Sequence, residues 1–170
     1  ILQVDLKEYD EKKFIEPKFN AWVLSNRLKT GTVDIIEETR GLDSINDFDK
    51  AIQLDSNYAG AFNNRGILFA ILNDYESSLV NYNVAISLMP NYKEAIYGRA
   101  TISILLNRYD DALYDLARVI EIDSCFGPAY YSAGKIFFKV ENFDEACTQF
   151  INASKCGVLE ADSIISKHCK

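Results

Sequence analysis

Apolar and small residues recur along this chain at a fixed interval of 34 positions. The stretch LNDYESSLVNYNVAISLMPNY, which starts at Leu72, is nearly repeated from Leu106, and a third version starts at Val140. Self-similarity at such an interval indicates an array of similar structural units, in which each unit buries its apolar face against its neighbours. The chain is therefore predicted to be one repeat array.

Residues at equivalent positions of the three units, 34 apart in the chain, keep a similar size, and we call each such set of positions a column. Three columns carry the pattern: small residues at Gly66, Ala100 and Gly134, small residues at Ser78, Ala112 and Ala146, and large residues at Tyr82, Leu116 and Phe150. Small residues let two helices approach closely, because a larger side chain would push the backbones apart. Large aromatic residues fill the space between neighbouring helix pairs. The columns thus predict closely packed helices.

Within one unit the apolar spacing is helical. Phe62, Gly66 and Phe69 follow one another at three or four residues, which is the spacing of one helix face. A second run of this kind follows after a short polar break. In the third unit Asn142 precedes Glu145 by three residues, which reads as a capping box for the second helix. Each unit is therefore predicted to be two antiparallel helices joined by a tight turn.

These columns resemble the tetratricopeptide repeat, whose period is about 34 residues. The residues that carry the resemblance are Phe62, Gly66, Phe69, Ser78, Tyr82, Ala85 and Pro90. It implies an all-α fold, a right-handed α–α superhelix built as a solenoid of stacked antiparallel helix pairs. Regular repeats are expected at 59–92, 93–126 and 127–158, within a single domain of residues 1–170. The departures are Ser124 and Val158 for the terminal proline, Ala100 for one glycine and Ser103 for one aromatic residue, and we expect them to weaken packing locally.

The segments outside these repeats are less regular. Residues 21–58 are predicted to form an irregular repeat with one extra helical turn between Leu28 and Ser44, which lengthens either its first helix or the loop between its helices. Residues 1–20 are either an N-terminal helix or the remnant of a preceding repeat. Residues 159–170 are predicted to form a capping helix, because the open end of a repeat array needs a polar outer face.

Composition and charge narrow the function. The chain has 170 residues, 48% of them hydrophobic, and a formal net charge of −7. Binding to phosphate backbones needs clustered lysine and arginine, so a nucleic-acid partner is not expected. A membrane partner is not expected either, because no apolar run approaches the roughly 20 residues that cross a bilayer. A cytoplasmic protein is favoured, with an exported form as the alternative if a signal peptide was removed.

The four cysteines all lie in the last third of the chain, and none forms a C-x-x-C pair. We expect reduced cysteines on half-buried helix faces, with a link from Cys147 or Cys156 to Cys169 as the alternative for an exported protein. A zinc site that combines these cysteines with His168 is not expected, because the spacings do not match the usual ligand pairs. No metal site is therefore predicted.

Catalytic chemistry has little support. His168, the one histidine, stands two residues from the end, where a catalytic base would lie on a fraying terminus. The segments NNRG and YGRA, which contain Arg65 and Arg99, recur in register and so indicate repeat packing more than a site. The chain is predicted not to be an enzyme and to hold no cofactor. The alternative is an accessory repeat region of a larger enzyme.

The resemblance implies that the first helix of each unit lines a concave groove. The predicted groove residues are Asn63, Asn64, Ile67, Tyr97, Thr101, Ile104, Tyr131, Lys135 and Phe138. Tyr97 and Tyr131 share a column, and they either recognise a ligand or cover neighbouring helix surface. We predict a protein–protein interaction module that binds a peptide or protein partner, as an adaptor or assembly scaffold. A self-associating structural domain, forming a homodimer, is the alternative.

Relatives that bind chaperone C-terminal tails use a clamp of lysine, asparagine and arginine in this groove. The corresponding columns here hold Asn63, Ile67, Gly98, Pro128 and Ser132. The cations of the clamp are missing, so binding of chaperone tails is not expected.

Overall fold

The structure is a computed structural model, and it describes residues 35–169. In this range the chain forms eight α-helices and no strand. The helices are α2 (Ile35–Leu54), α3 (Ala59–Ile71), α4 (Tyr75–Leu88), α5 (Lys93–Leu105), α6 (Tyr109–Ile122), α7 (Gly127–Lys139), α8 (Phe143–Lys155) and α9 (Glu160–His168). No helix of this range is long and apolar enough to span a bilayer. The helix predicted in residues 1–20 and the first helix of the irregular repeat lie outside the described residues.

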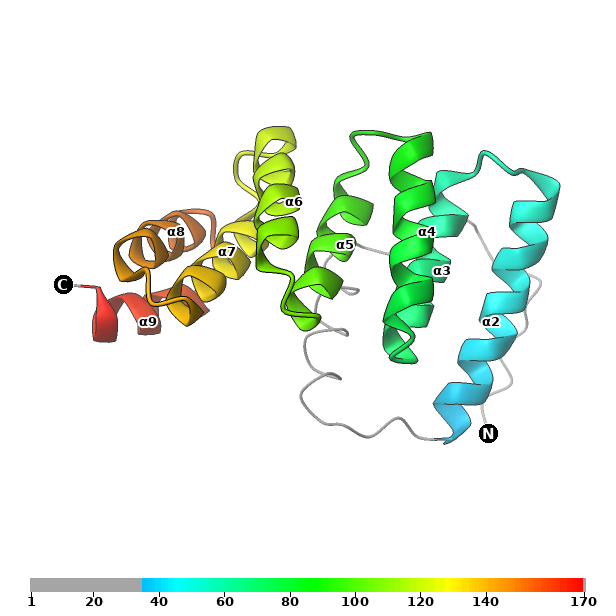
Figure 1. Ribbon diagram of the computed structural model, residues 1–170, viewed down its shortest axis with the longest axis horizontal. Helices are drawn as coiled ribbons and strands as arrows, with labels where there is room; N and C mark the ends of the chain where they lie inside the picture. Colours follow the sequence, from blue (N-terminus) through cyan, green and yellow to red (C-terminus); the bar gives the residue numbers. More distant parts are fainter. Residues whose placement is uncertain (1–34, 170) are drawn as a thin grey trace.

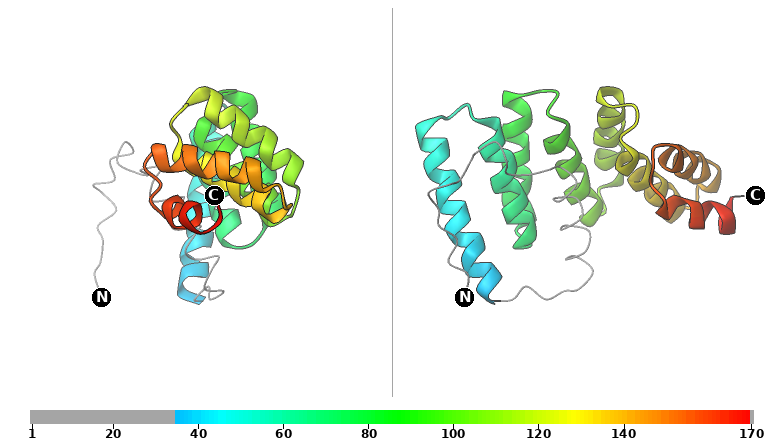
Figure 2. Two further views of the ribbon diagram at one scale, coloured as in Figure 1. Left: turned by 90° about the vertical axis from the view of Figure 1, so that its left-hand side faces the viewer. Right: turned by 180° about the vertical axis from the view of Figure 1, so that it is seen from behind.

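Helices that follow one another in the chain pack against each other as hairpins. The hairpins α3–α4, α5–α6 and α7–α8 stand side by side, with α2 and α9 at the two ends of the stack (Figures 1 and 2). The first helix α3 also packs on the first helix α5 of the next hairpin. The fold is therefore an all-α solenoid of stacked helix pairs, as the repeated columns predict.

The helix α2 differs from our expectation. It has 20 residues, against 14 in the equivalent helix α4. Both end in register, at Leu54 and Leu88, but α2 begins at Ile35, six residues before the position equivalent to Tyr75 (75 − 34 = 41). The extra turn that we placed in a longer first helix or a longer loop is therefore found, in the described residues, in the second helix, while the first helix lies outside them. The segment from Ile35 to Arg40 contains good helix formers and no proline, so it extends the second helix instead.

The core of the first unit depends on Tyr82, whose side chain is 0% exposed. Its ring lies between α3 and α5 where both helices carry a glycine. A Cβ atom added at Gly98 would lie 2.5 Å from Cζ of Tyr82, and one added at Gly66 would lie 3.1 Å from Cε1. Real Cβ atoms essentially never lie as close as 2.5 Å, so position 98 needs glycine while Tyr82 is present, whereas a Cβ atom at position 66 would require the ring to shift by a few tenths of an ångström.

The other units show the same match of sizes. In the third unit a Cβ atom at Gly134 would lie 2.8 Å from Cε1 of Phe150. In the second unit the same two columns hold Leu116 and Ala100, and both are buried. The aromatic ring thus occurs with glycine and the smaller leucine with alanine. The alanine at position 100 thus occurs together with the smaller Leu116, and both side chains are fully buried.

The hydroxyl group of Tyr82 is buried and has no hydrogen-bond partner among the described residues. Burial raises the pKa of this hydroxyl, and the nearby Ser78 hydroxyl donates instead to the carbonyl of Gly66 at 2.8 Å. A buried polar group without a partner is destabilising, because it loses its hydrogen bonds to water.

The substitution Tyr82→Phe should therefore raise the free energy of unfolding by about 1 kcal/mol. Urea denaturation followed by circular dichroism measures this change. Tyr114→Phe is the control, because the Tyr114 side chain is 66% exposed and its hydroxyl reaches water. A clear loss of stability in Tyr82→Phe would show that the hydroxyl has a partner.

The turns inside the three hairpins share a left-handed residue. The equivalent residues and their φ angles are Asn73 at 62°, Asn107 at 57° and Glu141 at 61°. Asparagine adopts this conformation more easily than glutamate does. The Tyr75 hydroxyl donates to Oδ1 of Asn73 at 3.0 Å, and the Tyr109 hydroxyl donates to Oδ1 of Asn107 at 2.5 Å. In the third unit glutamate and Phe143 replace both partners, so this hydrogen bond is missing.

Glu141→Asn should stabilise the chain by about 0.5 to 1 kcal/mol, because it relieves the left-handed strain at that position. Adding Phe143→Tyr should increase the gain by restoring the hydrogen bond seen in the other two turns. Thermal denaturation of the single and double variants measures both steps. Asn73→Glu, the reverse change in the first unit, should be destabilising, and an unchanged stability in all three variants would contradict this account of the turns.

Candidate functional site

The predicted groove residues lie on three neighbouring helices, and we call them the first-helix stripe. The stripe consists of Asn63, Asn64 and Ile67 on α3, Tyr97, Thr101 and Ile104 on α5, and Tyr131, Lys135 and Phe138 on α7. The helices α3 and α5 pack together, and a contact from Tyr97 to Ser132 joins α5 to α7. The stripe therefore runs across adjacent first helices, but its members differ in how much of each side chain a ligand could reach.

Asn63 is an interior residue. Only 3% of its surface is exposed, and its Nδ2 donates to Oδ1 of the neighbouring Asn64 at 3.1 Å. A ligand could not touch this side chain without moving others, so its placement among ligand contacts is wrong. Asn64 and Ile67 are half-buried and remain accessible on α3.

Tyr97 packs against the next unit. Its ring lies edge-on to Phe126 with centroids 5.0 Å apart, and its hydroxyl lies 3.3 Å from Oγ of Ser132. Burial raises the pKa of the Tyr97 hydroxyl, and the contact with Ser132 partly offsets this effect. Of our two interpretations, this geometry favours a ring that covers neighbouring helix surface. Thr101 and Ile104 are half-buried on the same helix.

The α7 part of the stripe is partly covered by later helices. The Tyr131 ring lies edge-on to Phe150 at 5.6 Å, and burial followed by the charge of Glu160 raises the pKa of its hydroxyl. Phe138 lies edge-on to the ring of His168 on α9, with centroids 5.1 Å apart. Lys135 is exposed, with Nζ 5.9 Å from the centre of the Tyr131 ring.

Arginine side chains connect successive units, as the recurring NNRG and YGRA segments suggest. Arg99 on α5 donates to both carboxylate oxygens of Asp115 on α6, each at 2.7 Å, and to Oδ1 of Asn83 on α4 at 2.7 Å. The hydrogen bonds to Asp115 raise the pKa of the Arg99 guanidinium. One side chain thereby joins the second helices of two units, and we call this set of contacts the arginine clamp.

The first unit has an arginine clamp as well, and the third does not. Arg65 on α3 donates to Oδ1 of Asn81 at 2.8 Å and to the carboxylate of Asp49 on α2. The same three columns of the third unit hold Ala133, Gln149 and Ala117. The three positions have changed together, so the third unit is held to the second without this polar link.

A shallow pocket opens beside the second clamp, between α4 and α6, where Asn83, Arg99 and Tyr114 line it. The charges of the partly buried Arg99 and the buried Asp115 neutralise each other there. The charges of this arginine clamp are thus paired with each other and link two units. Among the described side chains, no group of three or more His, Cys, Asp or Glu residues is placed to bind a metal ion.

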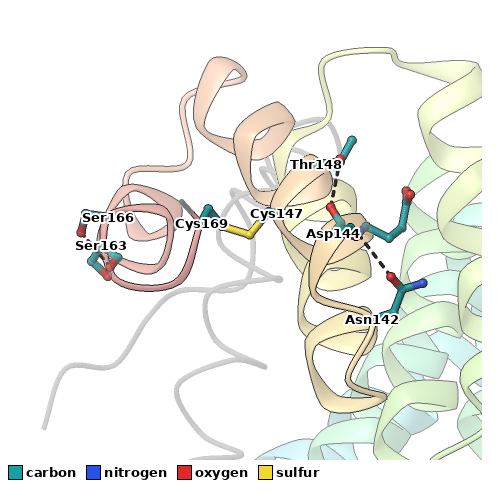
Figure 3. Close-up of a disulfide and its surroundings, with 8 residues drawn as sticks. Asn142, Asp144, Cys147, Thr148, Ser163, Ser166 and Cys169 are labelled. Atoms are coloured by element: carbon teal, nitrogen blue, oxygen red, sulfur yellow. Dashed lines mark hydrogen bonds between the residues drawn. A yellow bond between two sulfur atoms is a disulfide. The ribbon is translucent and has the colours of Figure 1, made fainter.

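All four cysteines form disulfides, and our expectation of reduced cysteines is wrong. Cys125 is bonded to Cys156 and Cys147 to Cys169, with Cα atoms 5.2 and 5.6 Å apart. The second pair, between α8 and the end of α9, is one of the alternatives that we left open (Figure 3). The partner of Cys125 was missed. Turns after successive second helices lie at the same edge of a solenoid, and this arrangement brings Cys125 and Cys156 together.

The two disulfides also bear on the compartment. Disulfides persist in oxidising environments and are rare in the cytosol, where thiol reductants keep cysteines reduced. This observation favours the exported form over the cytoplasmic one.

The matches of this chain to known proteins come from solved structures. No family model matches the chain, and no curated protein does either. Among solved structures, a crystal structure of MamA matches with a TM-score of 0.65 at 20% identity, covering 92% of this chain and 84% of that one. MamA 41-end from Desulfovibrio magneticus RS-1 matches with a TM-score of 0.65 at 18% identity, covering 83% of this chain and 75% of that one.

A third solved structure is the first TPR of Spaghetti (RPAP3), bound to an HSP90 peptide. It matches with a TM-score of 0.61 at 18% identity and covers 66% of this chain and 91% of that one. This chain has a tetratricopeptide-like repeat fold. The tetratricopeptide-like fold accounts for the paired helices, the interval of 34 residues and the right-handed superhelix that the resemblance implies. At these identities the similarity concerns the fold alone.

Proposed function

We propose that this chain is a non-catalytic interaction module that binds a protein or peptide segment along the first-helix stripe, as an adaptor or assembly scaffold. The proposal rests on one column of the stripe, the position that is equivalent in the three first helices. Its members are Ile67, Thr101 and Lys135. Ile67 and Thr101 are half-buried, and Lys135 is exposed. Their chemistry differs from unit to unit, whereas the packing columns keep their size and character. A position that packing does not restrict is free to serve a ligand.

The three side chains indicate what such a ligand would present. Ile67 offers an apolar contact, and the Thr101 hydroxyl donates only to the carbonyl of Tyr97 within its own helix at 2.9 Å. Lys135 makes no ion pair with any described residue. A segment that runs from α3 to α7 would therefore place an apolar residue first and an acidic residue last. Stacked repeats provide an extended surface of the length that such a segment needs.

A chaperone C-terminal tail is not the ligand that we propose, although the RPAP3 domain is bound to an HSP90 peptide. The clamp columns of such domains lack their cations here. In addition, Gly98 in one of these columns lies against Tyr82 and has no space for a side chain. Asn63, in another of these columns, is buried as well.

A display selection tests this proposal. Peptides selected from a random library on the wild-type protein should bind Lys135→Glu and Thr101→Arg at least about tenfold more weakly, a loss of about 1.4 kcal/mol. Lys155→Glu is the matched control, because Lys155 is exposed at the end of α8 and gives the same change of charge. If the selected peptides bind all three variants equally well, the stripe is not the binding surface.

Self-association is the second candidate, and exposed apolar residues on the second helices favour it. Val80 on α4 and Tyr114 on α6 occupy the same column and are 60% and 66% exposed. If this face forms a homodimer, light scattering across a dilution series should show a mass that rises with concentration. The rise should disappear in Val80→Ser with Tyr114→Ser. A constant monomer mass would exclude a homodimer at the concentrations measured.

A further inference from the structure

We propose that the disulfide between Cys147 and Cys169 is a reducible latch, which holds α9 over the aromatic end of the first-helix stripe. The latch concerns the position of α9 and does not depend on the proposed function. Three observations support it: the shortness of α9, the position of the cross-link, and the side chains that α9 covers.

The helix α9 is short, and few of its side chains are enclosed. It has nine residues, of which Ala161 alone is fully buried, while Ile164 and Ile165 are half-buried. Its first residue follows Leu159, which provides no side-chain cap. Helices shorter than roughly 12 to 15 residues are marginal without tertiary packing. Its non-covalent attachment consists of this apolar packing on α8 and a hydrogen bond from the Ser154 hydroxyl to Oδ1 of Asp162, and the disulfide adds a covalent link to them.

The disulfide supplies that covalent link at the far end of α9. Cys169 is the C-cap residue of α9, and Cys147 lies within α8, so the bond ties the C-terminal end of α9 to the preceding helix (Figure 3). Both cysteines are half-buried rather than enclosed, which leaves the sulfur atoms within reach of a thiol reductant. The cross-link closes a loop with a sequence separation of 22 residues and restricts the freedom of α9 to leave.

The third unit lacks two polar links that the first two units have. It lacks the arginine clamp, since Ala133 replaces the arginine, and it lacks the turn hydrogen bond, since Glu141 and Phe143 replace both partners. Both disulfides of the chain lie in this region. Both disulfides thus lie where the arginine clamp and the turn hydrogen bond are missing, although the contacts from Tyr97 to Ser132 and from Lys139 to Asn107 still join this unit to the second one.

The side chains under α9 show what its release would change. Phe138 contacts His168, and Tyr131 belongs to the same apolar cluster as Ile164 and Ile165 of α9. Departure of α9 would expose these two aromatic residues at the end of the stripe. Reduced protein would therefore present a longer apolar surface than oxidised protein.

The chemical step requires a reductant, which we take to be a dithiol. A thiolate of the dithiol attacks one sulfur of the Cys147–Cys169 bond and forms a mixed disulfide, and its second thiol then displaces the other cysteine. The S–S bond of the protein breaks and gains two electrons and two protons, so that two thiols result. The dithiol loses the same electrons and protons and becomes a disulfide.

Hydrogen exchange measured by mass spectrometry tests the latch on the full chain. After reduction with dithiothreitol, amides of residues 160–168 should exchange roughly a hundredfold faster, because the loop constraint is gone. The double variant Cys147→Ser with Cys169→Ser should show the same increase without reductant. The matched control, Cys125→Ser with Cys156→Ser, keeps the α8–α9 bond and should leave α9 protected. The helices α3 to α6 should not change in any sample.

Four results would each overturn the latch. The first is an unchanged protection of α9 in the Cys147→Ser, Cys169→Ser variant. The second is loss of α9 protection in the matched control, which would assign the role to the other disulfide. The third is an equal loss of protection across α3 to α6. The fourth is a Cys147–Cys169 bond that dithiothreitol does not reduce in the folded protein, as shown by alkylation and mass measurement.

Discussion

Replacing Asp115 with alanine should lower the free energy of unfolding by about 3 to 5 kcal/mol. The Asp115 side chain is 3% exposed, and both of its oxygens accept hydrogen bonds from Arg99 at 2.7 Å. Without the carboxylate, the partly buried guanidinium keeps its charge and loses its counter-charge. Asn83 would remain as a neutral partner, which does not compensate for the lost ion pair.

The third unit supplies the control for this prediction. Its equivalent columns hold Ala133 and Gln149, so the double variant Arg99→Ala with Asp115→Gln copies a pairing that the chain already uses. Because the double variant removes both charges, it should cost less than Asp115→Ala alone. Urea denaturation followed by circular dichroism measures both variants. If Asp115→Ala is no less stable than the double variant, the ion pair does not hold the units together as we describe.

Tyr82→Ala should lower the free energy of unfolding by a similar amount, about 3 to 5 kcal/mol. The ring fills the space between Gly66 and Gly98 and is fully buried, so alanine leaves a cavity that two glycine backbones cannot close. The large effect follows from the lost apolar contacts together with the cavity.

The second unit supplies the control here. It pairs Leu116 with Ala100 in the columns where the first unit pairs Tyr82 with Gly66. The double variant Tyr82→Leu with Gly66→Ala should therefore recover about 1 to 2 kcal/mol relative to Tyr82→Ala. Denaturation under the same conditions gives the comparison. A double variant that is less stable than Tyr82→Ala would show that the two columns do not compensate for each other's size.

The fold could be predicted from the sequence because the same pattern of small and large residues occurs in three successive units. The column of Gly66, Ala100 and Gly134, for example, indicates close helix packing at the same position of each unit. All three residues lie on first helices in the structure. The recurring Arg65 and Arg99 were recognised as packing residues for the same reason. Their partners, sixteen residues away in both directions, emerge only when the stacking of second helices is known.

The features that could not be predicted from the sequence depend on contacts between units, or they occur only once among the described units. Tyr97 shares a column with Tyr131, but whether its ring faces a groove or the next helix is set by the rotation of α5 against α7. The pairing of Cys125 with Cys156 likewise depends on the distance between two turns. The extension of α2 occurs once, so no second copy could indicate which helix contains it.

A labelled-protein titration tests the central claim most directly, that this solenoid binds its ligand along the first-helix stripe. A peptide from the display selection is added to 15N-labelled protein, and amide chemical shifts are followed by NMR. We predict that shifts concentrate on α3, α5 and α7, with Ile67, Thr101 and Lys135 among the residues affected most. Shifts that concentrate on the second helices α4 and α6, with the first helices unchanged, would contradict the account.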